Sequence, residues 1–265
     1  MEKLSIIANV EGLGRIVEAN TDFYTELQQL KNSGAVLITP RNEAYARLHT
    51  QGKEKIGKSY GIRTTGGFEY AKEKLPIFRV KSRLTNPKLA KLAVEANRAG
   101  NYFHTDSTRE YENSLKQAER DKNKEPEKRN VIILPSRIKF TMSDKQNWEI
   151  CQAILKDQAK PYFELNGPID VYPVDEKMVN AQDGTILTAL WFRGLVVGSG
   201  FGGDYWGLGD GDGARGVLRG SGEATSPKIL SLPYTQRQIT TELNRFSRLE
   251  SEIKKSIQFL ESLKQ

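Results

Sequence analysis

One stretch of the sequence matches the phosphate-binding loop of nucleotide enzymes. Gly52 to Ser59 reads GKEKIGKS, which satisfies the pattern G-x-x-x-x-G-K-[ST]. In such a loop the backbone amides cradle phosphates, the lysine reaches the terminal phosphate and the hydroxyl holds Mg²⁺. The pattern requires a buried strand before it and a helix after it. Here 42–51 has helical periodicity and 60–67 is rich in glycine and threonine, so we interpret the match as a chance occurrence in a Lys/Gly-rich loop.

Two acids and a lysine suggest a second chemistry. Metal-dependent nucleases place such residues around Mg²⁺ at the end of a strand, where the metal activates water. Asp170, Asp175 and Lys177 supply these residue types, and the last two are spaced to face the same way on an extended chain. A Pro-Val-Asp-Glu turn between two strands is the simpler interpretation. A nuclease remains an alternative hypothesis, and Mg²⁺ is expected as a cofactor only under it.

The composition disfavours most other metal and redox sites. His49 and His104 are the two histidines, and Cys151 is the one cysteine, whereas tetrahedral zinc sites need three or four such ligands. A single cysteine excludes an internal disulfide and fits a reducing compartment. No apolar run approaches the roughly 18 residues of a membrane span. We therefore expect a cytoplasmic protein with no membrane partner and no cofactor.

Glycine is concentrated in one segment, 194–222, which holds 12 of the 23 glycines of the chain. Its Asp-Gly-Asp-Gly run lacks the later ligands of a calcium loop, and no helix follows to make a dinucleotide fingerprint. We expect an ordered loop with Tyr205, Trp206, Arg215 and Arg219 at its surface, suited to a macromolecular contact. A glycine-rich hairpin of purely structural use is the alternative.

Positive charge is concentrated in another segment, 41–98. It contains 14 basic and five acidic residues, whereas the whole chain has a net charge of +7. Basic residues interleaved with aromatic ones are typical of a phosphate-contacting surface, although a solvated lysine-rich face would have the same composition. The residues predicted to bind nucleic acid are Lys53, Lys55, Lys58, Arg63, Lys72, Lys74, Arg79, Lys81, Arg83, Arg215 and Arg219.

Periodicity and turn residues predict an α+β fold with a mixed, mostly antiparallel sheet and flanking helices. Segment 50–67 is expected to be a loop, and in the strand 75–84 alternate residues Arg79, Lys81 and Arg83 would share one face. We expect strands at 3–10, 35–39, 75–84, 131–134, 137–141, 161–165, 169–174, 185–197 and 228–232, and helices at 22–31, 86–100, 109–121, after an N-cap at Ser143, and from Thr235.

The last of these helices is expected to be long and amphipathic. Its apolar positions recur every three or four residues and would pack on the body of the protein, on a second copy or on a partner. We therefore predict a single domain over 1–233 followed by the helix 234–265. Leu232-Pro233, Gln236 and Ile239 leading into a helix resemble the end of a specificity-subunit half in type I restriction systems, which implies DNA-associated work.

These observations favour a binding protein over an enzyme. The first hypothesis is a nucleic-acid-binding subunit of a nucleoprotein assembly of the defence, phage or mobile-element kind. It would contact the phosphate backbone through the basic strand and loop, and a protein partner or a second copy through the terminal helix. The alternatives are the Mg²⁺-dependent nuclease and a structural protein of a virion or filament.

Overall fold

The computed structural model describes residues 4–50, 61–174, 179, 183–193, 200–203, 208 and 213–218. Contacts divide the chain into two units, Met1–Gly222 and Glu223–Gln265, and the described residues all belong to the first. The segments 228–232 and 235–265, for which we predict a strand and the long helix, lie outside the described residues.

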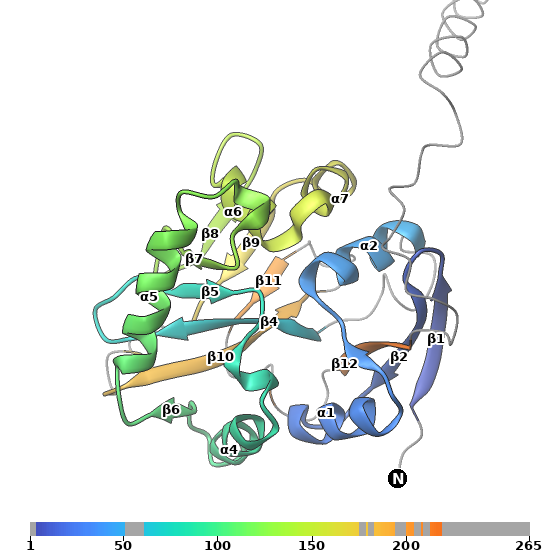
Figure 1. The fold of residues 1–265 in the computed structure, drawn as a ribbon, viewed down its shortest axis with the longest axis horizontal. Helices are drawn as coiled ribbons and strands as arrows, with labels where there is room; N and C mark the ends of the chain where they lie inside the picture. Colours follow the sequence, from blue (N-terminus) through green and yellow to red (C-terminus); the bar gives the residue numbers. More distant parts are fainter. Residues whose placement is uncertain are drawn as a thin grey trace, which may run out of the picture. The chain divides into compact units, whose positions relative to one another are not determined.

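A 12-stranded sheet forms the centre of the first unit (Figure 1). Its main path runs β1-β2-β12-β4-β10-β11-β9-β8. The pairings β4–β12 and β9–β11 are parallel and the other described pairings are antiparallel. The strands are β1 (Ser5–Val10), β2 (Gly14–Ala19), β3 (Val36–Leu37), β4 (Ile62–Tyr70), β5 (Ile77–Arg79), β6 (His104–Thr105), β7 (Val131–Ile133), β8 (Phe140–Met142), β9 (Ile169–Tyr172), β10 (Thr185–Phe192), β11 (Gly200–Gly202) and β12 (Gly213–Leu218).

Helices flank this sheet, as the sequence predicts. They are α1 (Phe23–Asn32), α2 (Pro40–Thr50), α4 (Pro87–Arg98), α5 (Arg109–Asp121), α6 (Trp148–Leu155) and α7 (Ala159–Asn166), with short 3₁₀ helices η1 (Arg83–Thr85), η2 (Pro126–Lys128) and η3 (Lys156–Gln158). The mixture of helices with a mostly antiparallel sheet confirms the predicted fold class at that level. The start of α4 is also as expected, because the side chain of Asn86 accepts the Lys88 amide and Pro87 takes the first helical position.

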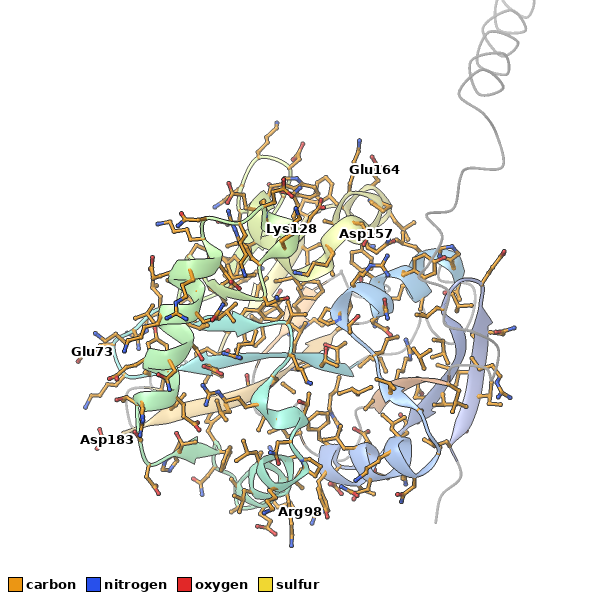
Figure 2. The ribbon with its side chains drawn as sticks, in the orientation of Figure 1. Glu73, Arg98, Lys128, Asp157, Glu164 and Asp183 are labelled. Carbon is orange, nitrogen blue, oxygen red and sulfur yellow. The ribbon has the colours of Figure 1, made fainter. Side chains whose placement is uncertain are left out.

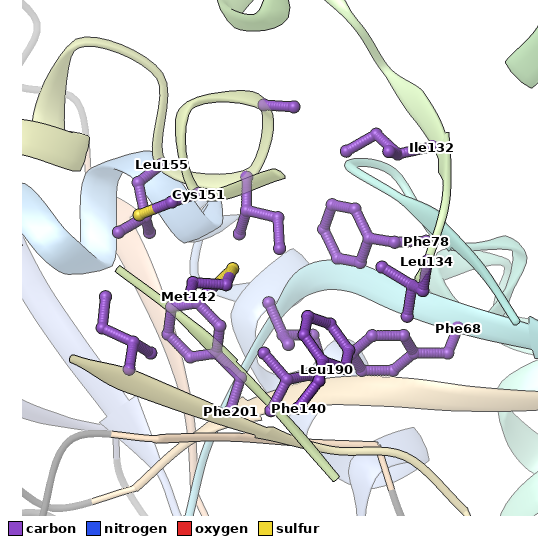
Figure 3. Packing of buried hydrophobic residues seen from close by; sticks show 14 of the residues in the cluster. Phe68, Phe78, Ile132, Leu134, Phe140, Met142, Cys151, Leu155, Leu190 and Phe201 are labelled. Carbon is purple, nitrogen blue, oxygen red and sulfur yellow. The ribbon is translucent and has the colours of Figure 1, made fainter. Parts of the chain in front are cut away.

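The largest apolar cluster lies between β4, β8, β9, β10 and β11 on one side and α2, α6 and α7 on the other. Figure 3 shows part of it, with Cys151 beside Leu155, and Phe68, Phe78 and Leu190 among its other members. Burial raises the pKa of the Cys151 thiol to about 12, so this cysteine is a packing residue and not a nucleophile at neutral pH.

Two segments expected to be loops contain central strands. β4 starts at Ile62 inside the predicted loop 50–67, and β12 lies within the glycine-rich segment yet pairs with β2 and β4. Both are buried on both faces, which removes the alternation that marks a half-buried strand. Their glycines permit close packing: a Cβ on Gly67 would approach Thr188 O to 2.4 Å, and one on Gly216 would approach Leu30 Cδ2 to 2.6 Å.

The strand expected at 161–165 is instead helix α7. Pro161 is the third residue of that helix, where its missing N–H costs nothing because the first four amides of a helix have no partner inside it. The predicted cap at Ser143 is also wrong. Ser143 Oγ accepts the amides of Lys145 and Gln146 in a turn, and α6 begins later, at Trp148.

The basic strand expected at 75–84 is shorter than predicted. β5 covers Ile77–Arg79, and Ser82 then caps the 3₁₀ helix η1 by accepting the Leu84 amide at 3.2 Å. Arg79, Lys81 and Arg83 therefore do not line one strand face. For α4 the sequence predicts an apolar stripe of Leu89, Leu92, Ala93 and Ala96. Ala93 is buried as expected, but Leu92 is 49% exposed and Ala90 is buried, because α4 packs closely against α1.

Candidate functional site

The arginines of the basic segment have acidic partners. Those partners are drawn largely from outside the segment, so charge that is concentrated in the sequence is compensated in space. The ion pairs are Arg41–Asp157, Arg47–Glu43, Arg63–Glu26, Arg79–Glu69, Arg83–Glu69, Arg83–Glu110 and Arg98–Asp22. Part of the local positive charge thus belongs to arginines that are paired with acidic residues, and the rest is carried by lysines.

Two of the residues predicted to contact nucleic acid, Arg63 and Arg215, are fully buried. Arg63 Nη1 lies 2.5 Å from Glu26 Oε2. Arg215 Nε lies 2.9 Å from Glu18 Oε2, and its Nη1 lies 2.6 Å from Glu43 Oε1. Neither guanidinium can reach a phosphate at the surface, because each is paired with acidic side chains in the interior.

The pair formed by Arg215 belongs to a longer buried ionic chain, which we define as Glu18, Arg215, Glu43 and Arg47. Arg47 Nε donates to Glu43 Oε1 at 2.7 Å, and its Nη1 donates to the carbonyl oxygen of Arg193 at 2.6 Å. The chain carries two positive and two negative charges. It therefore joins β2, β12 and α2 without net charge, and it fixes the backbone at the end of β10.

Glu26 is a third buried acidic residue, and its burial disfavours the ionised form. Burial raises the pKa of Glu26 to about 8, although the nearby Arg63 guanidinium favours the charged form. Glu26 also accepts the Thr21 amide at 3.2 Å. The protonation state of Glu26 is therefore expected to change between mildly acidic and mildly basic pH.

Arg79 and Arg83 are partly exposed, but both point at Glu69, and Arg83 also bonds to α5. Arg83 Nε donates to Glu69 Oε1 at 2.9 Å and its Nη2 donates to the Glu110 carbonyl at 2.9 Å. Arg79 Nη1 donates to Ser114 Oγ, also on α5, at 2.9 Å. These contacts attach α5 to the sheet.

The remaining predicted cations with described positions are three lysines. Lys72, Lys74 and Lys81 are exposed. The first two flank Glu73, which Figure 2 places at one side of the molecule, whereas Arg98, at the end of the same basic segment, lies on another side. Lys53, Lys55, Lys58 and Arg219 lie outside the described residues, as do the phosphate-loop pattern, Tyr205 and Trp206.

A different set of side chains does come together, on four neighbouring strands. Phe140, Val171, Phe201 and Phe192 occupy paired positions on β8, β9, β11 and β10 and face the apolar core. Side chains alternate between the two faces of a strand. The residues on either side of this row therefore face the opposite way, and they include Lys139, Asp170, Tyr172, Trp191 and Arg193. We call these five residues the Tyr172 cluster.

Stacking holds the Tyr172 cluster together. Arg193 Cζ lies 3.9 Å from the centroid of the Tyr172 ring and 5.4 Å from that of Trp191. Lys139 Nζ lies 5.0 Å from the centroid of Tyr172. A cation near an aromatic face is attracted by the negative charge above the ring. Trp191 is buried, Arg193 and Tyr172 are half-buried, and the Lys139 side chain is 52% exposed.

Two glycines on β11 make room for this arrangement. A Cβ on Gly202 would lie 2.1 Å from the Trp191 ring, and one on Gly200 would lie 3.2 Å from Arg193 Cδ. Because both glycines lie on the same face of β11, the side chains of β10 can lie across that strand toward Tyr172 on β9. The alternation of W-x-R with G-x-G, which the sequence shows at 191–193 and 200–202, is the signal that sequence reasoning missed.

Asp170, a candidate catalytic residue, belongs to this cluster. It accepts hydrogen bonds from Lys139 Nζ at 2.7 Å, Thr141 Oγ1 at 2.7 Å and Tyr172 Oη at 3.2 Å. Burial alone would raise the pKa of Asp170, but the bonds from Lys139 and Thr141 lower it below its usual value. Asp175 and Lys177 lie outside the described residues. In the described ranges, no group of three His, Cys, Asp or Glu residues could hold a metal ion.

One helix presents a second group of stacked side chains. On α2, the rings of Tyr45 and His49 stack with centroids 3.9 Å apart, and Arg41 Cζ lies 6.0 Å from the Tyr45 centroid. Their spacing of four residues puts them on one face of the helix. Arg41 is also paired with Asp157, through Nε and Nη2 at 2.6 and 2.5 Å.

The described fold is similar to a solved structure that shows the accommodation of massive sequence variation in Nanoarchaeota by the C-type lectin fold. The match has a TM-score of 0.52 and 16% sequence identity, and it covers 77% of this chain and 96% of that chain. The likeness identifies the fold as one of the C-type lectin kind. No protein-family model and no curated protein matches the sequence. Among the described helices, none is long and apolar enough to cross a bilayer.

Proposed function

We propose that this chain is a binding protein rather than an enzyme, and that its recognition surface includes the Tyr172 cluster. The observation that carries this proposal is the meeting of three charged and two aromatic side chains on the sheet face opposite the core. Rigid aromatic rings and arginine are the residues that dominate recognition surfaces. They are preorganised here by mutual stacking, so little side-chain entropy remains to be lost on binding.

The similar solved structure supports the same proposal. Its fold accommodates massive sequence variation, which requires a core that stays folded while other positions change. In the described part of this chain, the residues that pack the core differ from the residues of the Tyr172 cluster. The row of Phe140, Val171, Phe201 and Phe192 closes the core, and residues one position away are turned to the other face. Substitutions there can alter binding without emptying the core.

The proposal is tested with a panel of probes: single-stranded DNA, heparin, a mannose polymer and an acidic peptide. Binding is measured for the wild-type chain and for the double variant Lys139→Gln/Arg193→Gln. The control, Lys116→Gln/Arg120→Gln, removes the same charge from the exposed face of α5. We expect at least one probe to bind the wild type and the control equally and the cluster variant more weakly. If no probe binds the wild type, or if every bound probe binds the cluster variant as well as the wild type, the proposal is wrong.

Nucleic-acid binding is the second candidate function, and the stacked residues of α2 are the observation that favours it. Tyr45 and His49 offer aromatic faces on which unpaired bases can stack, and Lys53, Lys55 and Lys58 follow in the sequence. The exposed Lys72, Lys74 and Lys81 add positive charge elsewhere. The nucleoprotein subunit of a defence, phage or mobile-element assembly remains the setting proposed for this activity.

Anisotropy with labelled single-stranded DNA and RNA at increasing salt tests this second candidate. The logarithm of the binding constant is expected to fall linearly with the logarithm of salt concentration, because bound phosphates release counterions. Tyr45→Ala is expected to weaken binding by about 1–3 kcal/mol, the contribution of one stacked base. His104→Ala, a change of a ring residue on β6, is the control. Absence of binding at low ionic strength would exclude this function.

A further inference from the structure

We propose that Arg193 and Lys139 form an oxyanion-binding site on the ring of Tyr172, so that the ligand of the Tyr172 cluster carries a carboxylate or phosphate group. This inference deepens the proposed function and rests on it. It names the chemical groups that the Tyr172 cluster would bind, which the fold alone does not indicate.

The surroundings of Arg193 differ from those of the arginines in the basic segment. Each arginine at 41–98 that the structure describes has a carboxylate within ion-pair distance. Within the described ranges Arg193 has no carboxylate within ion-pair distance, and its guanidinium lies against aromatic rings instead. A guanidinium has five N–H donors and no acceptor. An oxyanion would supply acceptors for these donors, and charge-assisted bonds of this kind are stronger than neutral ones.

Stacking determines how that acceptor must approach. Tyr172 lies against the guanidinium at 3.9 Å, and Trp191 lies at 5.4 Å. Rings above a planar guanidinium occupy its faces and leave the N–H bonds at its edge, where they match the two oxygens of a carboxylate or phosphate. The backbone is also fixed, because Arg47 donates a hydrogen bond to the Arg193 carbonyl. The cation is thus held before any ligand arrives.

The charge of the cluster favours an anion. Lys139 and Arg193 are positive and Asp170 is the one negative side chain of the five. Asp170 is already occupied by bonds from Lys139, Thr141 and Tyr172, so it does not neutralise Arg193. Its lowered pKa keeps it ionised and paired with Lys139 at neutral pH. An oxyanion bound at Arg193 would therefore neutralise the remaining positive charge and accept a further bond from the exposed Lys139 ammonium.

Calorimetric or NMR titration with inorganic phosphate and with succinate tests the inference at constant ionic strength in chloride. The two arms distinguish a phosphate group from a carboxylate group. We expect one or both to bind the full chain and to shift the amide resonances of β9 and β10. Arg193→Gln is expected to weaken binding about tenfold or more, the effect of losing a charge-assisted bond, whereas Arg120→Gln leaves it unchanged. Arg193→Lys keeps the charge but loses the fork, and it is expected to lie between these results.

Thermal unfolding of each variant shows whether it folds, and Arg193→Lys keeps the test valid if Arg193→Gln does not. Failure of both anions to bind, or equal binding by wild type and Arg193→Gln, overturns the inference. The proposed function fails differently. If a probe from the panel needs the Tyr172 cluster but is not displaced by phosphate or succinate, the cluster is a binding surface without an oxyanion site. If every bound probe binds the wild type and the cluster variant equally, both proposals are wrong.

Discussion

Two groups of arginines in this molecule have opposite surroundings. In the buried ionic chain, Arg215 and Arg47 are fully buried and alternate with Glu18 and Glu43. In the Tyr172 cluster, Arg193 is half-buried, lies on aromatic rings and has no described carboxylate partner. The same residue type therefore stabilises the fold in one place, and in the other we propose that it binds a ligand. The difference lies in the acidic residues that the fold brings nearby.

The largest expected effect comes from removing Arg215. Arg215→Ala leaves Glu18 buried without its ion pair and Glu43 with Arg47 alone, and such losses cost about 3–5 kcal/mol of unfolding free energy. Urea denaturation measures the change. Arg193→Ala is the contrasting variant and is expected to lose less than about 1 kcal/mol, because no described ion pair is broken. Equal destabilisation by the two variants would remove the distinction between the two groups.

Gly202→Ala tests whether the Tyr172 cluster depends on space above β11. The new Cβ would lie 2.1 Å from the Trp191 ring, so the ring must move, and overpacking of this kind costs about 1–3 kcal/mol. Gly200→Ala meets the more movable Arg193 side chain at 3.2 Å and is expected to cost less. Thermal unfolding gives the order, and near-ultraviolet circular dichroism reports the tryptophan. A larger loss for Gly200→Ala would contradict the packing described above.

The buried acid Glu26 predicts a dependence of stability on pH. Its pKa rises from 4.5 to about 8 on folding, so between these values the folded state binds more protons than the unfolded state. Stability is therefore expected to be greatest near the acid end of this window and to fall by at least about 1 kcal/mol as the pH rises toward 8. Denaturation at pH 5 and pH 8 measures this slope. Glu26→Gln should reduce it, and an unchanged slope would assign it to other groups.

Asp170→Asn is expected to lower stability the least of these variants and to strengthen anion binding. The Lys139–Asp170 pair is partly exposed, so its loss costs about 1 kcal/mol or less. Ionised Asp170 has a lowered pKa; its contribution is present above pH about 4 and is lost as the pH falls further. The substitution also releases Lys139, so phosphate or succinate should bind more tightly. Weaker binding would show that Asp170 positions the site instead.

Several elements could be predicted because their signals are local. Helix α5 occupies Arg109–Asp121, the predicted range, and α4 starts after Asn86 with Pro87. The end of β10, at Phe192 rather than 197, and the burial of α4 could not be predicted in the same way. In α4, Ala90 is buried and Leu92 is exposed because small residues allow α1 to approach. The sequence of one helix does not show which of its residues a neighbouring helix will cover.

The sequence by itself determined the fold class, the positions of the well-capped helices and the absence of an internal disulfide. These follow from residue types, periodicity and the count of one cysteine. The tertiary structure decided that Ile62–Tyr70 and Gly213–Leu218 are central strands. Their glycines are needed there because neighbouring atoms approach the backbone too closely for a side chain. It also decided which cations are available. Contacts form between residues far apart in the chain, so Arg63 and Arg215 lie against acidic side chains in the interior, whereas Arg193 meets aromatic rings.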